Sequence, residues 1–150
     1  MLEILITLTI IAIALLGTAG LQMYAIRIGQ SGQFRTQAVF LASDIAERME
    51  ANRMAAVNGN YVVGATNTPS VATSDCRATP CNEISLAAFD ISQWENTIIS
   101  MLPQPSWEIT QTTPGNPSIY TIRISWADRS SVSTSRGEIF SYTATRTVRN

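Results

Sequence analysis

The chain has 150 residues, ten basic and eleven acidic side chains, and a formal net charge of −1. Every basic residue is an arginine and they are scattered along the chain, which argues against nucleic-acid binding by bulk electrostatics. The chain contains no histidine, so it lacks the commonest general base and the commonest metal ligand. We therefore expect no enzyme, no metal site and no cofactor.

Residues 4–26 carry no charge and are mostly Ile, Leu and Ala. The run is long enough for a membrane-spanning helix, which needs about 20 residues, although a signal peptide and a buried core helix are alternatives. A signal peptide would begin with basic residues, whereas Glu3 precedes this run. We therefore expect a transmembrane helix over residues 1–26. Its glycines suggest either close helix packing or a stretch that loosens outside the membrane.

The next segment, residues 27–57, is predicted to continue the helix in amphipathic form. Between residues 33 and 56 there is neither Gly nor Pro. Apolar residues recur there at steps of three and four and form one stripe, namely Phe34, Ala38, Leu41, Ile45 and Met49. We expect this stripe to pack on the chain's own globular domain, residues 58–150. One continuous helix over residues 1–57 would be about 85 Å long.

The two cysteines, Cys76 and Cys81, are separated by a short segment that contains Pro80. With no histidine they cannot complete a tetrahedral zinc site by themselves, and the spacing is not that of a redox Cys-x-x-Cys motif. We expect a disulfide, which implies an oxidising compartment, rather than a pair of free thiols. The polar residues 64–75 before them are predicted to form a surface loop.

A second, short helix is predicted to begin at Asp90, with Gln93 completing a capping box. Phe89 and Trp94 have the spacing of a hydrophobic staple. Pro103 would end the helix. Its apolar stripe consists of Ile91, Trp94, Ile98 and Met101.

From Trp107 onward the apolar period changes to two, which is typical of strands. We expect an antiparallel three-stranded meander over residues 107–111, 120–126 and 140–148, with residues 61–63 as a short additional edge strand. One face of such a sheet can cover the long helix. The predicted class is α+β: a long N-terminal helix on a small antiparallel sheet, with one extra short helix.

The chain resembles the type IV pilin-like proteins along its whole length, starting with Met-Leu-Glu-Ile-Leu-Ile-Thr-Leu at residues 1–8. Residues 37–52, Gln-Ala-Val-Phe-Leu-Ala-Ser-Asp-Ile-Ala-Glu-Arg-Met-Glu-Ala-Asn, are similar to the signature of the minor pilins called PilV, the type IV pilus modification protein family. Residues 90–94, 101–103 and 120–126 also look like landmarks of that family. The resemblance implies the type IV pilin fold.

The same resemblance gives Glu3 a role. Pilins are made with a basic leader that is cut ahead of the glutamate, and we infer such processing here from the resemblance alone. The partner of Glu3 would be a free α-amino group, in its own chain or in the subunit ahead, so that the pair sets subunit register. The alternative is that Glu3 only favours the positive end of the helix dipole.

The resemblance implies a minor pilin that helps prime pilus assembly and ends near the pilus tip. It would be a single-pass inner-membrane protein with a periplasmic C-terminal domain, later part of the pilus at the cell surface. Its partners would be other minor pilins and the major pilin through the N-terminal helix, the inner-membrane assembly platform, and membrane lipid before assembly, with no small-molecule substrate. Residues 64–77 and 130–137 are candidate contact loops.

Three alternatives remain open from the sequence. The first is a minor pseudopilin of a type II secretion system, which shares the anchor. The second is a membrane-anchored periplasmic enzyme, but a carboxylate pair such as Asp44 and Glu47 fits a solvated helix face better than a catalytic site. The third is a DNA-binding pilin. Its arginines would be clustered, whereas here they are spread over several predicted elements, at Arg123, Arg129, Arg136, Arg146 and Arg149.

Overall fold

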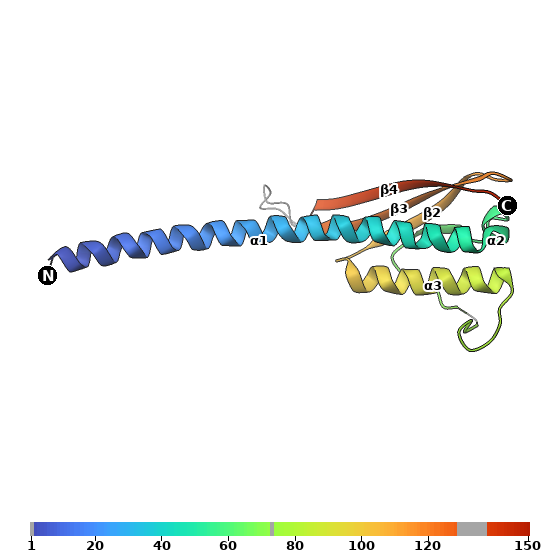
Figure 1. Cartoon of the computed structure of the whole chain (residues 1–150), viewed down its shortest axis with the longest axis horizontal. Coiled ribbons are helices and arrows are strands. Elements are labelled where there is room, and N and C mark those ends of the chain that lie inside the picture. Colours follow the sequence, from blue (N-terminus) through green and yellow to red (C-terminus); the bar gives the residue numbers. More distant parts are fainter. Residues whose placement is uncertain (1, 73, 129–137) are drawn as a thin grey trace.

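The computed structural model of the chain describes residues 2–72, 74–128 and 138–150. A single long helix, α1, runs the length of the molecule, and its N-terminal half projects from a globular part built around its C-terminal half (Figure 1). The elements in chain order are α1 (Leu2–Ala51), α2 (Arg53–Val57), β1 (Val63–Thr66), α3 (Glu83–Met101), β2 (Ser106–Thr113), β3 (Ser118–Asp128) and β4 (Glu138–Val148). The predicted α+β class, a long helix on a small antiparallel sheet, is confirmed.

The sheet has four antiparallel strands in the order β1-β2-β3-β4. The predicted three-stranded meander is present as β2, β3 and β4, and the additional edge strand is present as β1, which begins at Val63 instead of occupying residues 61–63. Tyr61 is completely buried ahead of that strand. The period-two pattern correctly gave the inner face, on which the following side chains are buried: Trp107, Ile109, Tyr120, Ile122, Ile124 and Trp126.

The helix α1 covers this inner face, and α3 packs against α1. α1 contacts β3 and β4, and α3 lies alongside α1 (Figure 1). In α1 the apolar stripe faces the domain: Leu41, Ile45 and Met49 are at most 3 % exposed, and Phe34 is partly buried at the edge of the core. Full burial of one such side chain stabilises the fold by about 1.5–3 kcal/mol. The C-terminal half of α1 is therefore part of the domain core.

The long helix is interrupted at Asn52, so the prediction of one helix to about residue 57 is wrong at this point. Asn52 leaves helical geometry, with φ −115° and ψ 58°. Its buried amide donates hydrogen bonds to the backbone O of Glu83, at 2.7 Å, and to the hydroxyl of Tyr61, at 3.3 Å. An asparagine side chain readily makes such bonds in place of helical ones. α1 itself has 50 residues, or about 75 Å of helix.

α3 begins well before the predicted start at Asp90. Asn82 caps it, because its Oδ1 accepts a hydrogen bond from the backbone N of Ser85 at 2.8 Å. The predicted capping box and staple at Asp90 are therefore wrong, and Asp90 lies in the middle of the helix facing α1. At the other end Met101, which was predicted to be buried, is exposed, and Leu102 is buried in its place.

Candidate assembly surface

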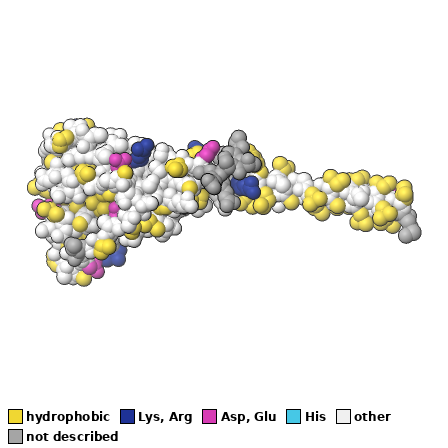
Figure 2. Space-filling view, turned by 180° about the vertical axis from the view of Figure 1, so that it is seen from behind, with side chains coloured by type: hydrophobic (Ala, Val, Ile, Leu, Met, Phe, Trp, Pro, Cys, Tyr) yellow, Lys and Arg dark blue, Asp and Glu magenta, His cyan; other side chains and the backbone are white. Residues whose placement is uncertain are grey.

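The N-terminal half of α1 is exposed along its whole described length. Every residue from 2 to 30 is exposed, and Figure 2 shows hydrophobic side chains gathered along this projecting stalk. α1 is long and apolar enough to cross a membrane, and its most apolar window has no part buried in the domain. An apolar surface of this extent is a binding surface or an aggregation hazard in water. The stalk is therefore a candidate membrane span and a candidate packing surface for other apolar helices.

The small and polar residues of the stalk are not explained by contacts with the rest of the described chain. The helix continues through Gly17, Gly20, Gly29 and Gly32, and apart from the adjacent residues and the backbone of the helix itself no atom lies within 4 Å of where a Cβ would be. The Thr7 hydroxyl donates to the carbonyl of Ile4, so its polar group is satisfied within the helix. The fold of the domain therefore gives no reason for these glycines, which points to a contact outside the chain or to helix loosening.

Glu3 lies in the first turn of α1 and is exposed. A carboxylate in the first helical turn interacts favourably with the helix dipole. The described residues include neither the α-amino group expected as its partner nor a second subunit. The register role of Glu3 therefore stays a prediction.

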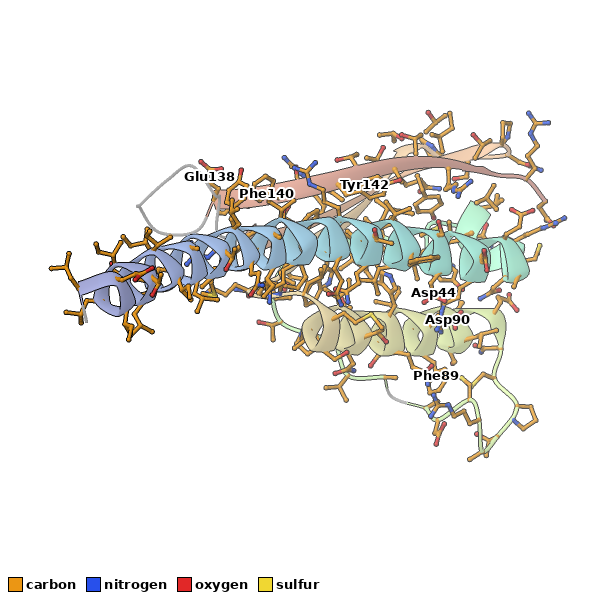
Figure 3. The ribbon with its side chains drawn as sticks, turned by 60° about the vertical axis from the view of Figure 1, so that its left-hand side comes forward. Asp44, Phe89, Asp90, Glu138, Phe140 and Tyr142 are labelled. Atoms are coloured by element: carbon orange, nitrogen blue, oxygen red, sulfur yellow. A yellow bond between two sulfur atoms is a disulfide. The ribbon has the colours of Figure 1, made fainter. Side chains whose placement is uncertain are left out.

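A polar cluster fastens α1 to α3 beside the apolar core. Arg48 Nε lies 3.1 Å from Asp44 Oδ2 and its Nη1 lies 3.2 Å from Asp90 Oδ1. The hydroxyl of Tyr61 donates to the other oxygen of Asp90 at 2.7 Å. Figure 3 shows Asp44 and Asp90 on the α3 side of α1, opposite Tyr142. Asp44 thus forms an ion pair with Arg48. The cluster connects three segments that are distant in the sequence: α1, α3 and the segment before β1.

The cluster changes the acidity of its members. Burial lowers the pKa of Arg48, but hydrogen bonds and attraction to Asp44 and Asp90 outweigh burial and raise that pKa overall. Burial raises the pKa of the Tyr61 hydroxyl well above its ordinary value, and its hydrogen bond to Asp90 raises it further. Arg48 therefore stays charged and Tyr61 neutral at physiological pH.

A buried carboxylate that the sequence analysis missed connects α3, β2 and the loop after β1. Glu95 is 1 % exposed, and its Oε1 accepts a hydrogen bond from the indole Nε1 of Trp107 at 2.9 Å. Its Oε2 accepts from the backbone N and the hydroxyl of Ser70. The available signal was its position next to Trp94 and three residues before Ile98, on the buried side of the helix.

The same loop contains a disulfide between Cys76 and Cys81, with an S–S distance of 2.05 Å. The loop extends away from α1 beyond α3 (Figure 1). Of the two candidate contact loops, the first was predicted over residues 64–77, but residues 64–66 belong to β1. The rest is tied to α3 through Ser70, and Thr73 lies outside the described residues. The other loop, residues 130–137, is also outside them. Within the described ranges, no group of three or more His, Cys, Asp or Glu side chains could hold a metal ion.

Residues 20–92 match a type IV pilin family. The family is described as Tt1218-like, type IV pilin Tt1218. The match extends from the apolar stalk, through the half of α1 that lies in the domain, into α3. No curated protein and no solved structure gives a match to the chain. The family match supports a pilin-type structural role, membrane anchoring and interaction with other pilins in a pilus.

Proposed function

We propose that the chain is a minor pilin of the PilV type that helps prime type IV pilus assembly with other minor pilins in the inner membrane. Its domain lies in the periplasm before assembly, and the assembled protein ends near the pilus tip. The observation that carries this proposal is that one helix is exposed over residues 2–30, carries no charge over residues 4–26, and is then built into the core of a folded domain.

This geometry gives the stalk two successive environments. Lipid covers it while the protein is held in the membrane, and the helices of other pilins cover it in the filament. Moving from lipid to protein brings no hydrophobic gain, because lipid tails are as apolar as leucine side chains. Helix packing and the few polar groups of the stalk must then decide which neighbours bind and in what register.

Glu3 suits this task, because it is the charged group at the N-terminal end of the uncharged run, residues 4–26. Opposite charges a few Å apart attract strongly where the dielectric constant is low. A shift in axial register would leave both the carboxylate and its amine partner unpaired in an apolar setting, which is costly. One ion pair can therefore select the register while the apolar surface provides the contact area.

The test is Glu3→Gln in the processed protein, followed by co-purification with the other pilins from the same membrane. We expect recovery of partner pilins to fall about tenfold or more, equivalent to about 1.4 kcal/mol of lost coupling. Thr7→Val is the matched control, because it removes a polar group one turn further along the helix without removing a charge. Equal recovery with Glu3→Gln and Thr7→Val would refute the register role.

A deletion strain tests the function itself. Loss of the chain should reduce the number of surface pili. Normal piliation together with a defect in type II secretion would instead assign the protein to the pseudopilins.

A further inference from the structure

The strand β4 presents a long edge. It lies at one end of the sheet order and pairs with β3 without a register shift from Ser118↔Val148 to Asp128↔Glu138. Its 11 residues contain neither Pro nor Lys, which are the usual means of blocking such an edge. Along the described part of the chain no strand pairs with its outer side. The opposite edge, β1, has 4 residues and an irregular register.

The inner face next to this edge is only partly covered. Phe140 and Tyr142 are half-buried, although Trp126 and Ile124, their direct neighbours on β3, are at most 2 % exposed. Figure 3 shows Phe140 and Tyr142 on the sheet side of α1. A further strand beside β4 would place alternate side chains above the same face.

Two hollows lie between β4 and α1 where those side chains would enter. The first, of about 240 Å³, is lined by Arg35, Val39, Trp126, Phe140, Ser141 and Tyr142. The second, of about 350 Å³, lies nearer the C-terminal end of β4 and is lined by Ala46, Glu47, Glu50, Arg146, Thr147 and Val148. Each hollow has space for at least one large side chain.

The two hollows differ in charge. In the first, the guanidinium of Arg35 lies 5.4 Å from the centroid of the Phe140 ring. Trp126 in its wall has a buried indole N–H without a hydrogen-bond partner in the described residues. This hollow therefore favours a hydrogen-bond acceptor with negative charge. In the second, Glu50 already pairs with Arg53 at 2.7 Å, so Glu47 is the carboxylate that a basic side chain entering beside Arg146 would meet.

We propose that the edge of β4 binds an extended segment of another protein as a fifth strand, antiparallel to β4. The segment carries a basic residue over the Glu47 hollow and, about four residues later, an acidic residue over the Arg35 hollow. The spacing follows from the separation of Tyr142 and Arg146, about 13 Å along the strand. Strand addition of this kind obtains affinity from main-chain hydrogen bonds and specificity from alternate side chains. The inference goes beyond the helix-mediated assembly proposed above and does not depend on it.

The test uses the full ¹⁵N-labelled chain in detergent micelles and a capped peptide, Thr-Arg-Thr-Val-Thr-Glu-Thr. We expect amide shift changes centred on β4 and at least about tenfold slower hydrogen exchange at its newly paired amides. The control peptides are the same sequence with alternate backbone nitrogens methylated and a version with Arg and Glu exchanged. Both should bind at least about tenfold more weakly.

Variants of the protein locate the site. Arg35→Gln and Glu47→Gln should each weaken binding of the peptide about threefold or more. Arg123→Gln, an exposed arginine on the opposite face of the sheet, should leave it unchanged. Absence of shifts in β4, equal binding of the methylated peptide, or equal binding of the exchanged peptide would each overturn the proposal. A dimer of the free chain joined through β4 would overturn it as well, because the occupant would then be a second copy.

Discussion

Replacing Glu95 by alanine should destabilise the domain more than any change of a surface acid. Glu95 is buried between α3 and β2 and accepts hydrogen bonds from Trp107 and Ser70. In the variant, the indole N–H of Trp107 stays buried without an acceptor. Ser70 lies at the surface, so water can replace the carboxylate there.

The expected magnitude follows from these environments. A buried donor left without an acceptor costs about 1–3 kcal/mol, and this applies to Trp107. Removal of the buried methylene carbon of Glu95 costs about 0.8 kcal/mol. The bonds to Ser70 add less than about 1 kcal/mol, because water compensates. We therefore expect the free energy of unfolding to fall by about 2–5 kcal/mol. Glu95→Gln, which keeps the shape and one acceptor, should lose about half as much.

The assay is urea unfolding of the full chain in a mild detergent, followed by tryptophan fluorescence. Glu108→Ala is the control, since Glu108 pairs with Arg123 at 3.9 Å near the surface. An exposed pair of this kind contributes under about 1 kcal/mol. A loss for Glu95→Ala no greater than that for Glu108→Ala would refute the argument that this carboxylate is a structural acceptor.

Two further predictions concern the same domain. Tyr61 has an ordinary pKa of 10.0 that burial raises in the fold, so its stabilising effect is complete below about pH 10 and is lost as pH rises toward the folded value. The free energy of unfolding should therefore fall as the pH rises above about 10, and it should fall less in Tyr61→Phe than in the wild type. Equal slopes would contradict this, and Tyr142→Phe is the control. Replacing Cys76 and Cys81 together by serine should cost about 2 kcal/mol, as the entropy of closing a short loop predicts. A reductant should shift the urea midpoint of the wild type to that of the variant, and an unchanged midpoint would show that the disulfide does not stabilise the fold.

The layout of the fold could be predicted from the sequence because it depends on local periodicity. The step of three from Ala38 to Leu41 and the steps of four to Ile45 and Met49 gave the buried side of α1. The step of two gave the inner face of β2 and β3. The start of α3 could not be obtained in this way. Asn82 and Asp90 are both good capping residues. Which of them caps α3 depends on Arg48 and Tyr61, which are distant in the sequence and donate hydrogen bonds to the carboxylate of Asp90.

The buried polar contacts likewise could not be predicted from the sequence. Glu95 receives bonds from Ser70, 25 residues away, and Asn52 bonds the backbone of Glu83, 31 residues away. Nothing in the spacing of these residues indicates which partner each will find, because the loop between β1 and α3 has no periodicity. Glu3 presents the opposite situation: its proposed partner belongs to the chain terminus or to another subunit.

The two fastenings of α3 to α1 have a mechanical consequence. Trp94 donates to the backbone O of Leu41 at 2.8 Å, and Arg48 binds Asp90 about two turns further along α1. These two contacts fix the rotational orientation of the domain about the axis of α1. Inserting one residue into the stalk would turn the domain by about 100° and displace it by about 1.5 Å. In a bundle of parallel helices, the length of the stalk would then decide which side of the domain faces outward.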